Sequence, residues 1–186
     1  MTAAVLLVGL QNDYAHPAGA NSRVRDLRVP DLEALVAAVN RLTALARANG
    51  WPVFWSQVSW ADEDASGLLG RRRPHLRQAL RTGTWGAALL DDLVVLESDR
   101  RIQATRFSAF HGTSLVTQLA GTERLYVGGV GTDYLVESTV RDAFQHDLDV
   151  IVVADAVQGY SDRAHHRALE AMSSVFATIL NSPDLA

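Results

Sequence analysis

The sequence predicts an α/β fold of three layers, in which helices cover both faces of a central, mostly parallel sheet of about six strands. Short apolar runs typical of strands alternate with helical patterns along nearly the whole chain, and this alternation favours a parallel sheet with crossover helices. The run 148–154 is strongly apolar, as expected of a strand buried on both faces of such a sheet. The 186 residues fit one domain over 1–186, since domains usually have about 100–200 residues.

The predicted strands are short apolar runs that end at glycine, proline or polar residues. The last of them is expected at an edge of the sheet. In chain order the strands span 4–10, 52–57, 101–104, 124–130, 148–154 and 176–180.

Helical patterns lie between these strands. The first helix is expected to begin near Pro30, with Asp31 in its first turn, and to end at Gly50. Further helices are predicted over 112–119, 134–146 and 165–175. The elements together predict a Rossmann-like arrangement, in which residues 59–85, without clear periodicity, form a lid or substrate loop.

Ligands of open α/β sheets bind beyond the carboxyl ends of the strands, where the strand order reverses. The residues that follow the predicted strands are therefore expected to meet in one crevice. They are Asp13, Gln57, residues 104–108, residues 131–135 and Asp155.

The segment 128–139 reads Gly-Gly-Val-Gly-Thr-Asp-Tyr-Leu-Val-Glu-Ser-Thr, ends the fourth strand and leads into the next helix. It resembles the signature of the isochorismatase-like cysteine hydrolases, in which a Gly-Val-x-Thr-Asp/Asn turn is followed by the catalytic cysteine. Leu6–Tyr14, with Gln-Asn-Asp-Tyr, and Arg106–Leu115 are similar to two further motifs of that family and occur in the same order. The resemblance covers most of the chain and implies a single isochorismatase-like hydrolase domain and a homo-oligomer.

Two positions depart from the family pattern. Leu135 stands where the resemblance places the cysteine, and Ala104 stands where it places a lysine. Because a leucine side chain has no lone pair and the chain contains no cysteine, covalent thiol catalysis is excluded. Of the catalytic groups that the resemblance implies, only the acid or base Asp13 is present.

Two functions remain open. In the first, an isochorismatase-family hydrolase-like protein uses Asp13 in general acid/base chemistry on a small molecule, without a covalent cysteine intermediate. The resemblance provides a precedent, because true isochorismatases protonate a vinyl ether through the aspartate; a related elimination or isomerisation is a variant. In the second, the protein is a catalytically inactive pseudoenzyme that binds a small molecule or a protein partner, and Asp13 caps the turn after the first strand.

The predicted ligand contacts come from the crevice and from the segments beside it. Trp55 is equally suited to the core, Thr132 to capping the next helix, and Arg106 to replacing part of the missing lysine's charge. The contacts are Gln57, Trp55, Trp60, Arg106, Gly131, Thr132 and Tyr134.

Composition limits the partners. The net charge of -4 and the pI near 5.8 argue against nucleic acid as the main partner. No apolar run approaches the roughly 20 residues that span a bilayer, and residues 1–10 lack a basic leader, so we expect a cytoplasmic protein without a membrane partner. The histidine spacing indicates no metal site.

No cofactor is expected either. Gly129-Val130-Gly131 follows a strand, as in dinucleotide-binding proteins, but Tyr134 replaces the third glycine of that fingerprint. The one basic run, 71–77, is either a solvated loop or a contact for phosphates or an anionic substrate.

Overall fold

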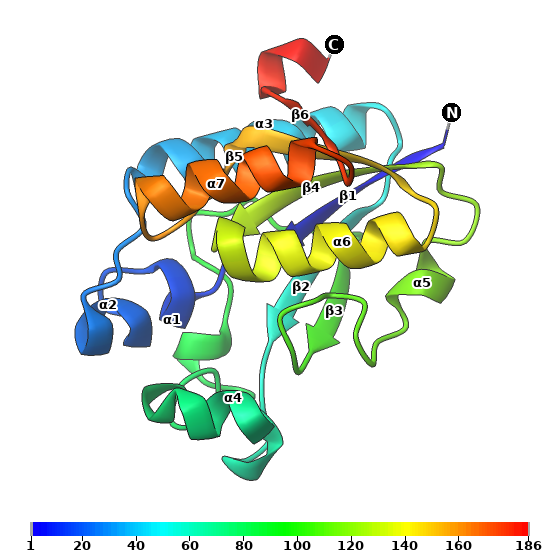
Figure 1. Cartoon of the computed structure of the whole chain (residues 1–186). Helices are drawn as coiled ribbons and strands as arrows, with labels where there is room; N and C mark the ends of the chain where they lie inside the picture. Colours follow the sequence, from blue (N-terminus) through cyan, green and yellow to red (C-terminus); the bar gives the residue numbers. More distant parts are fainter. Residues whose placement is uncertain (1, 186) are drawn as a thin grey trace.

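The computed structural model describes residues 2–185, and of His75, which belongs to the basic run, only the backbone. Six strands form one fully parallel sheet in the order β3-β2-β1-β4-β5-β6, which confirms the predicted fold class (Figure 1). The strands are β1 (Ala3–Val8), β2 (Val53–Val58), β3 (Arg100–Ala104), β4 (Arg124–Val130), β5 (Asp149–Gln158) and β6 (Thr178–Leu180).

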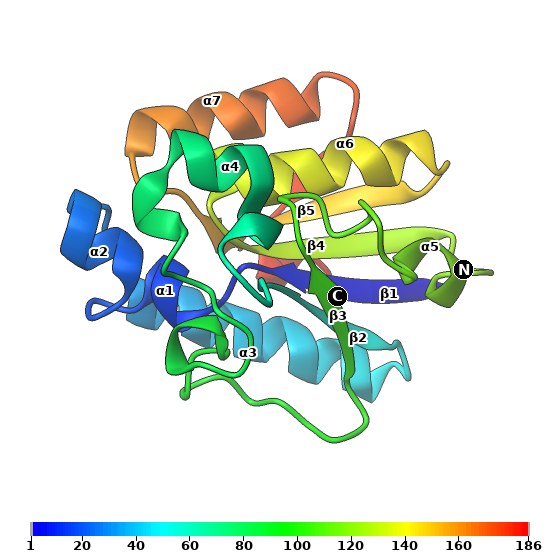
Figure 2. The ribbon, with the colours of Figure 1, turned by 90° about the horizontal axis from the view of Figure 1, so that it is seen from below.

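Helices form the outer layers. Helix α3 packs on one face of the sheet, and α6 and α7 lie on the other (Figure 2). The short helices α1, α2 and α4 lie at the carboxyl ends of the central strands. The helices are α1 (Asn12–Ala15), α2 (Ala20–Arg25), α3 (Leu32–Ala48), α4 (Gly67–Arg72), α5 (Leu115–Gln118), α6 (Glu137–Gln145) and α7 (Asp162–Ser173).

The predicted boundaries differ from the structure where short-range patterns carry little signal. Helices α1 and α2 were not predicted, because segments of four and six residues are too short to show a helical period. The helix predicted over 134–146 begins instead with a π-helical turn, Thr132–Val136, before α6. Strand β5 continues to Gln158, beyond the predicted end at Ala154, because its pairing with β4 shifts register between Val127 and Gly129.

The centre of the core is β1, all six residues of which are buried. Trp55 on β2 is also fully buried, and its indole donates to Asp99 at 2.9 Å. Burial by itself raises the pKa of Asp99, but hydrogen bonds from Arg47, the Leu96 amide and Trp55 outweigh it, and the pKa lies below its ordinary value. Trp55 thus belongs to a core network, as its alternative interpretation proposed.

Within residues 2–185, no helix has both the length and the apolar character required to cross a membrane.

Candidate functional site

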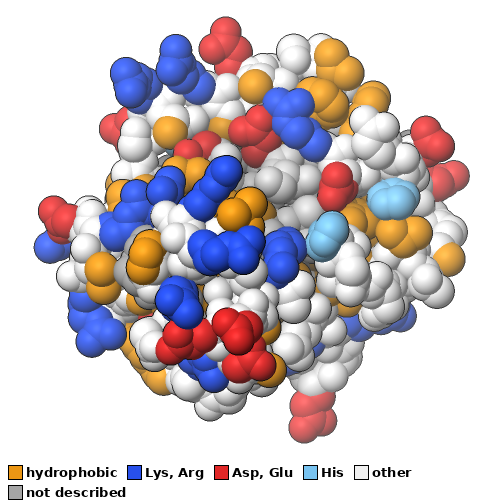
Figure 3. Space-filling model, turned by 60° about the horizontal axis from the view of Figure 1, so that its bottom comes forward, with side chains coloured by type: hydrophobic (Ala, Val, Ile, Leu, Met, Phe, Trp, Pro, Cys, Tyr) orange, Lys and Arg blue, Asp and Glu red, His pale blue; other side chains and the backbone are white. Residues whose placement is uncertain are grey.

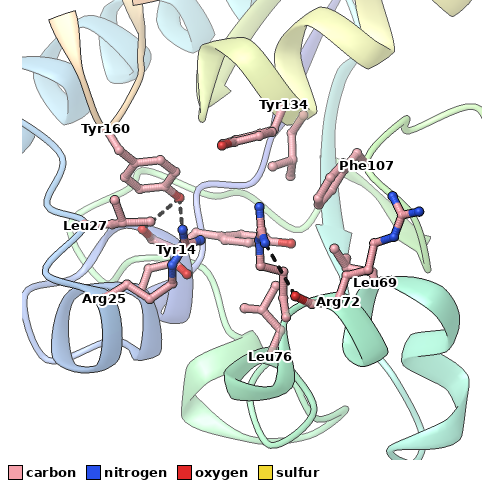
Figure 4. Close-up of a pocket in the computed structure, with 12 residues that line it drawn as sticks. Tyr14, Arg25, Leu27, Leu69, Arg72, Leu76, Phe107, Tyr134 and Tyr160 are labelled. Atoms are coloured by element: carbon pink, nitrogen blue, oxygen red, sulfur yellow. Dashed lines mark hydrogen bonds between the residues drawn. The ribbon is translucent and has the colours of Figure 1, made fainter. Parts of the chain in front are cut away.

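A cavity of about 280 Å³ lies beyond the carboxyl ends of β1 and β4. Four aromatic rings surround it: Tyr160 on one side, Phe107 on the opposite side, Tyr134 above, and Tyr14 across the middle (Figure 4). The centroids of the Phe107 and Tyr134 rings are 5.9 Å apart. Apolar side chains complete the wall, and these are Leu27, Leu69, Leu76 and Leu135.

Tyr160 ties two walls of the cavity together. Its hydroxyl donates to the carbonyl of Tyr14 at 3.1 Å and accepts from Asn21 Nδ2 at 3.0 Å. Burial raises its pKa, so the hydroxyl stays protonated at neutral pH. A residue just after β5 and two residues from the first short helices therefore hold one another in place.

Tyr14 lines the same cavity, yet its hydroxyl has no hydrogen-bond partner among the described residues. The side chain is 4% exposed. Burial, together with the nearby Tyr160 and Asp13, raises the pKa of Tyr14 well above its ordinary value. A buried hydroxyl without a partner costs about 1–3 kcal/mol, so this protonated donor has an unused hydrogen-bonding capacity in the cavity wall.

The charged residues of the lining are three arginines, Arg25, Arg72 and Arg73, and the lining includes no aspartate or glutamate. None of the three forms an ion pair with a described residue. On the face shown in Figure 3, arginine side chains gather around hydrophobic ones. Two of the lining arginines come from the basic run, so part of that run meets the cavity instead of lying only in solvent.

Gln11 and Asn12, which precede the predicted catalytic aspartate, anchor the segment around residue 86. Gln11 is fully buried and donates to the carbonyls of Val58 and Ala87 at 2.9 and 2.8 Å, while its side-chain oxygen accepts from the Val58 amide. Asn12 donates to the carbonyl of Trp85 at 2.8 Å. Gln11 thus joins the end of β2 to the loop around residue 86, and Asn12 holds the same loop.

Asp13 is held in the same way. Its Oδ1 accepts from the Ala20 amide at 3.0 Å, and its Oδ2 accepts from the Leu80 amide at 2.7 Å. Gly86 packs against the carboxylate so closely that a Cβ there would lie 2.0 Å from Oδ2. Asp13 is 7% exposed and does not line the cavity.

The residue that faces Leu135 just beyond the end of β1 is Gly9. A Cβ at position 9 would lie 2.8 Å from Leu135 Cδ2 and 2.5 Å from the Val130 carbonyl oxygen. The φ of +68° at Gly9 also favours glycine. The strand end opposite the predicted nucleophile position therefore carries no side chain that could act as a base.

A family model described as the isochorismatase domain matches residues 3–184. The chain belongs to the isochorismatase family. This confirms the resemblance seen in the sequence motifs.

Several relatives within the isochorismatase family are amide hydrolases by name. The chain is 33% identical to ureidoacrylate amidohydrolase RutB of Methylobacterium radiotolerans, over 94% of this chain and 74% of the relative. It is 34% identical to the Methylorubrum extorquens protein of that name, over 83% and 69%.

Solved structures have the same fold as this chain. An isochorismatase family protein from Desulfovibrio vulgaris superposes with a TM-score of 0.84 at 27% identity, covering 99% of this chain and 96% of the other. Nicotinamidase/pyrazinamidase PncA from Bacillus subtilis superposes with a TM-score of 0.85 at 24% identity, covering 97% and 100%.

Of the predicted ligand contacts, Tyr134 lines the cavity of this isochorismatase-family protein, beside Leu135. Trp60 is buried, and its indole donates to the Thr105 carbonyl. Gln57 donates to the Ala87 carbonyl and accepts from Arg101 in a separate hollow. These two side chains and the core residue Trp55 point to other partners.

The remaining predicted contacts support the turn and the loop. Gly131 lies under the ring of Tyr160, where a Cβ would be 3.1 Å from Cε2. Thr132 is buried and pairs with His165 Nδ1 at 2.8 Å. Arg106 donates to the carbonyls of Ala65 and Thr105 and does not line the cavity.

The amides of the turn are largely used within it. Those of Tyr134, Leu135 and Val136 all point to the carbonyl of Gly131, at 3.0 to 3.3 Å. Ala104 is buried at the end of β3 and does not line the cavity. Among the side chains that the structure describes, no three histidines, aspartates or glutamates are grouped closely enough to hold a metal ion.

Proposed function

We propose that this isochorismatase-family protein binds a small molecule in the cavity without hydrolysing it. The observation that carries the proposal is the composition of the lining, which consists of leucine, phenylalanine, tyrosine, asparagine and arginine alone. Phenol groups have pKa values of about 10 and guanidinium groups stay protonated, and burial raises the pKa of Tyr14 further. No nucleophile or base that works at neutral pH touches the space where a substrate would lie.

The positively charged lysine that the family resemblance places at position 104 is also missing. The chain contains no lysine, because its 17 Lys and Arg residues are all arginine. The retained cavity, with aromatic walls and positive charge, supports binding as the surviving role. We also propose, from the sequence, that the protein is a cytoplasmic homo-oligomer.

The other function predicted from the sequence is acid/base hydrolysis by Asp13. It requires the Asp13 carboxylate to leave the Ala20 or Leu80 amide and reach a bound substrate. Because the two hypotheses differ only in turnover, a hydrolysis assay separates them.

The purified protein is expected to leave ureidoacrylate, nicotinamide and the vinyl ether isochorismate unhydrolysed. The first two probes follow the names of relatives, and the third tests protonation of an enol ether. Ammonia release reports amide hydrolysis, and pyruvate release reports vinyl-ether hydrolysis. Asp13→Asn, assayed at a temperature where it is folded, is expected to match the wild type. Turnover that the wild type shows and Asp13→Asn loses would establish the acid/base hypothesis instead.

The double variant Leu135→Cys/Ala104→Lys is expected to stay inactive on amides. The new thiol would face Gly9, which has no side chain to take its proton. Adding Gly9→Asp would set a carboxylate opposite the thiol, but its Cβ would lie 2.5 Å from the Val130 carbonyl oxygen at a φ that favours glycine, so the triple variant is expected to lose stability and to stay inactive as well. Circular dichroism checks that both variants fold. If the double variant alone hydrolyses amides and loses this activity on Asp13→Asn, Asp13 is the base.

A further inference from the structure

The cavity has a charge that the protein does not neutralise. Arg25 comes from α2, while Arg72 and Arg73 come from the end of α4 and the residue after it, so separate segments bring three cations to one space. The arginines have no acidic partner among the lining residues. Guanidinium groups pair readily with planar anionic oxygen groups through parallel hydrogen bonds. An anionic ligand would supply the missing partner.

The size of the cavity and its aromatic walls indicate the size and the ring content of the ligand. The cavity of about 280 Å³ lies just below the usual range of small-molecule sites, which is about 300–1,000 Å³. Phe107, Tyr134 and Tyr160 approach it from three sides (Figure 4). Aromatic side chains stack favourably on flat rings, so the shape suits a ligand with one or two rings.

Tyr14 adds a specific donor. Its hydroxyl is buried at the cavity and lacks a partner among the described residues, whereas that of Tyr160 is fully used. Buried polar groups in native proteins nearly always have partners. This hydroxyl therefore marks where an acceptor atom of the ligand would lie.

We propose that the ligand of this cavity is a small aromatic anion, a ring carrying a carboxylate or phosphate, held by Arg25, Arg72 and Arg73 and by a hydrogen bond from Tyr14. The proposal rests on the small-molecule binding function above and names its ligand class. The carboxylate and phosphate forms share the same recognition chemistry, and the experiment distinguishes them.

Isothermal titration calorimetry with three probes of similar shape tests this ligand class. Benzoate and phenyl phosphate are anions, whereas benzamide is neutral. At least one anion is expected to bind about tenfold or more tightly than benzamide, because hydrogen bonds to charged groups are the strong ones. The anion that binds more tightly shows whether the ligand carries a carboxylate or a phosphate.

Matched arginine variants locate the binding. Arg25→Gln and Arg72→Gln are each expected to weaken binding of the preferred anion by about tenfold. Arg23→Gln and Arg71→Gln remove the same charge from the same helices but from side chains that do not line the cavity. Binding is expected to remain within about twofold for these controls, because their side chains make no direct hydrogen bond to a ligand in the cavity and more distant charges are screened by salt.

Tyr14→Phe separates recognition from folding. It is expected to weaken the anion severalfold without lowering Tm, since the hydroxyl has no partner to lose in the unliganded protein. Equal binding of benzamide and both anions, no binding of either anion, or equal effects of lining and control arginines would overturn the ligand class. Release of ammonia from benzamide would instead contradict the non-hydrolytic function and leave the ligand class standing.

Discussion

Asp13→Ala is expected to lower the free energy of unfolding by about 2–6 kcal/mol, because it strands two buried backbone amides that cost about 1–3 kcal/mol each. These are the amides of Ala20 and Leu80, which both donate to the Asp13 carboxylate. Asp13→Asn keeps one acceptor oxygen and is expected to lose about half as much. Urea unfolding followed by circular dichroism measures both changes.

Asp92→Ala is a suitable control for Asp13→Ala. Asp92 is exposed, so its removal is expected to change stability by no more than about 0.5 kcal/mol. If Asp13→Ala were as mild as this control, its contacts with the two amides would not matter to folding. A chemical role for Asp13 would then be the better explanation of its presence.

Gly129→Ala is expected to lower the free energy of unfolding by about 2–6 kcal/mol, the sum of backbone strain and overpacking. Gly129 has a φ of +138°, and a Cβ there would lie 2.0 Å from the Val8 carbonyl oxygen. A backbone atom of the central strand cannot move aside without disturbing the pairing of β1 with β4. That pairing positions the turn that carries Tyr134 and Leu135, so anion binding is expected to weaken as well.

Gly121→Ala measures the cost of backbone strain without a steric clash. Gly121 also has a positive φ, +82°, but a Cβ there would meet nothing within 4 Å. Its replacement is expected to cost about 1–2 kcal/mol, the penalty of a left-handed conformation alone. Guanidinium unfolding compares the two variants. Equal losses at both positions would mean that the strand contact at Gly129 is relieved by relaxation.

Much of the fold could be predicted because its signal is local. The apolar run of β4 matches its predicted bounds, 124–130, and the alternation of strand and helix patterns led to the parallel sheet. Leu135 was placed beside the crevice by the turn that precedes it, and it does line the cavity. Helix α2 brings Arg25 to the site. It was not predicted, because six residues are too few to show a helical periodicity.

The candidate site depends on partners that are distant in the chain. The motif around Asp13 predicts a catalytic role, but the two amides that donate to its carboxylate lie 7 and 67 residues away in the chain. Tyr160 reaches Tyr14 across 146 residues. In a run of arginines, which ones face a cavity depends on how α4 packs, and no local pattern distinguishes Arg72 from Arg71.

The sequence by itself determined which chemistry is available: without cysteine or lysine, no thiol or lysine side chain can act, whatever the fold. Only the tertiary structure decided where the remaining groups point. It turns Asp13 toward backbone amides, sets Gly9 opposite Leu135, and leaves the Tyr14 hydroxyl without a partner at the cavity. The reason is physical: composition limits the functional groups, whereas hydrogen bonds and packing between distant segments set their direction.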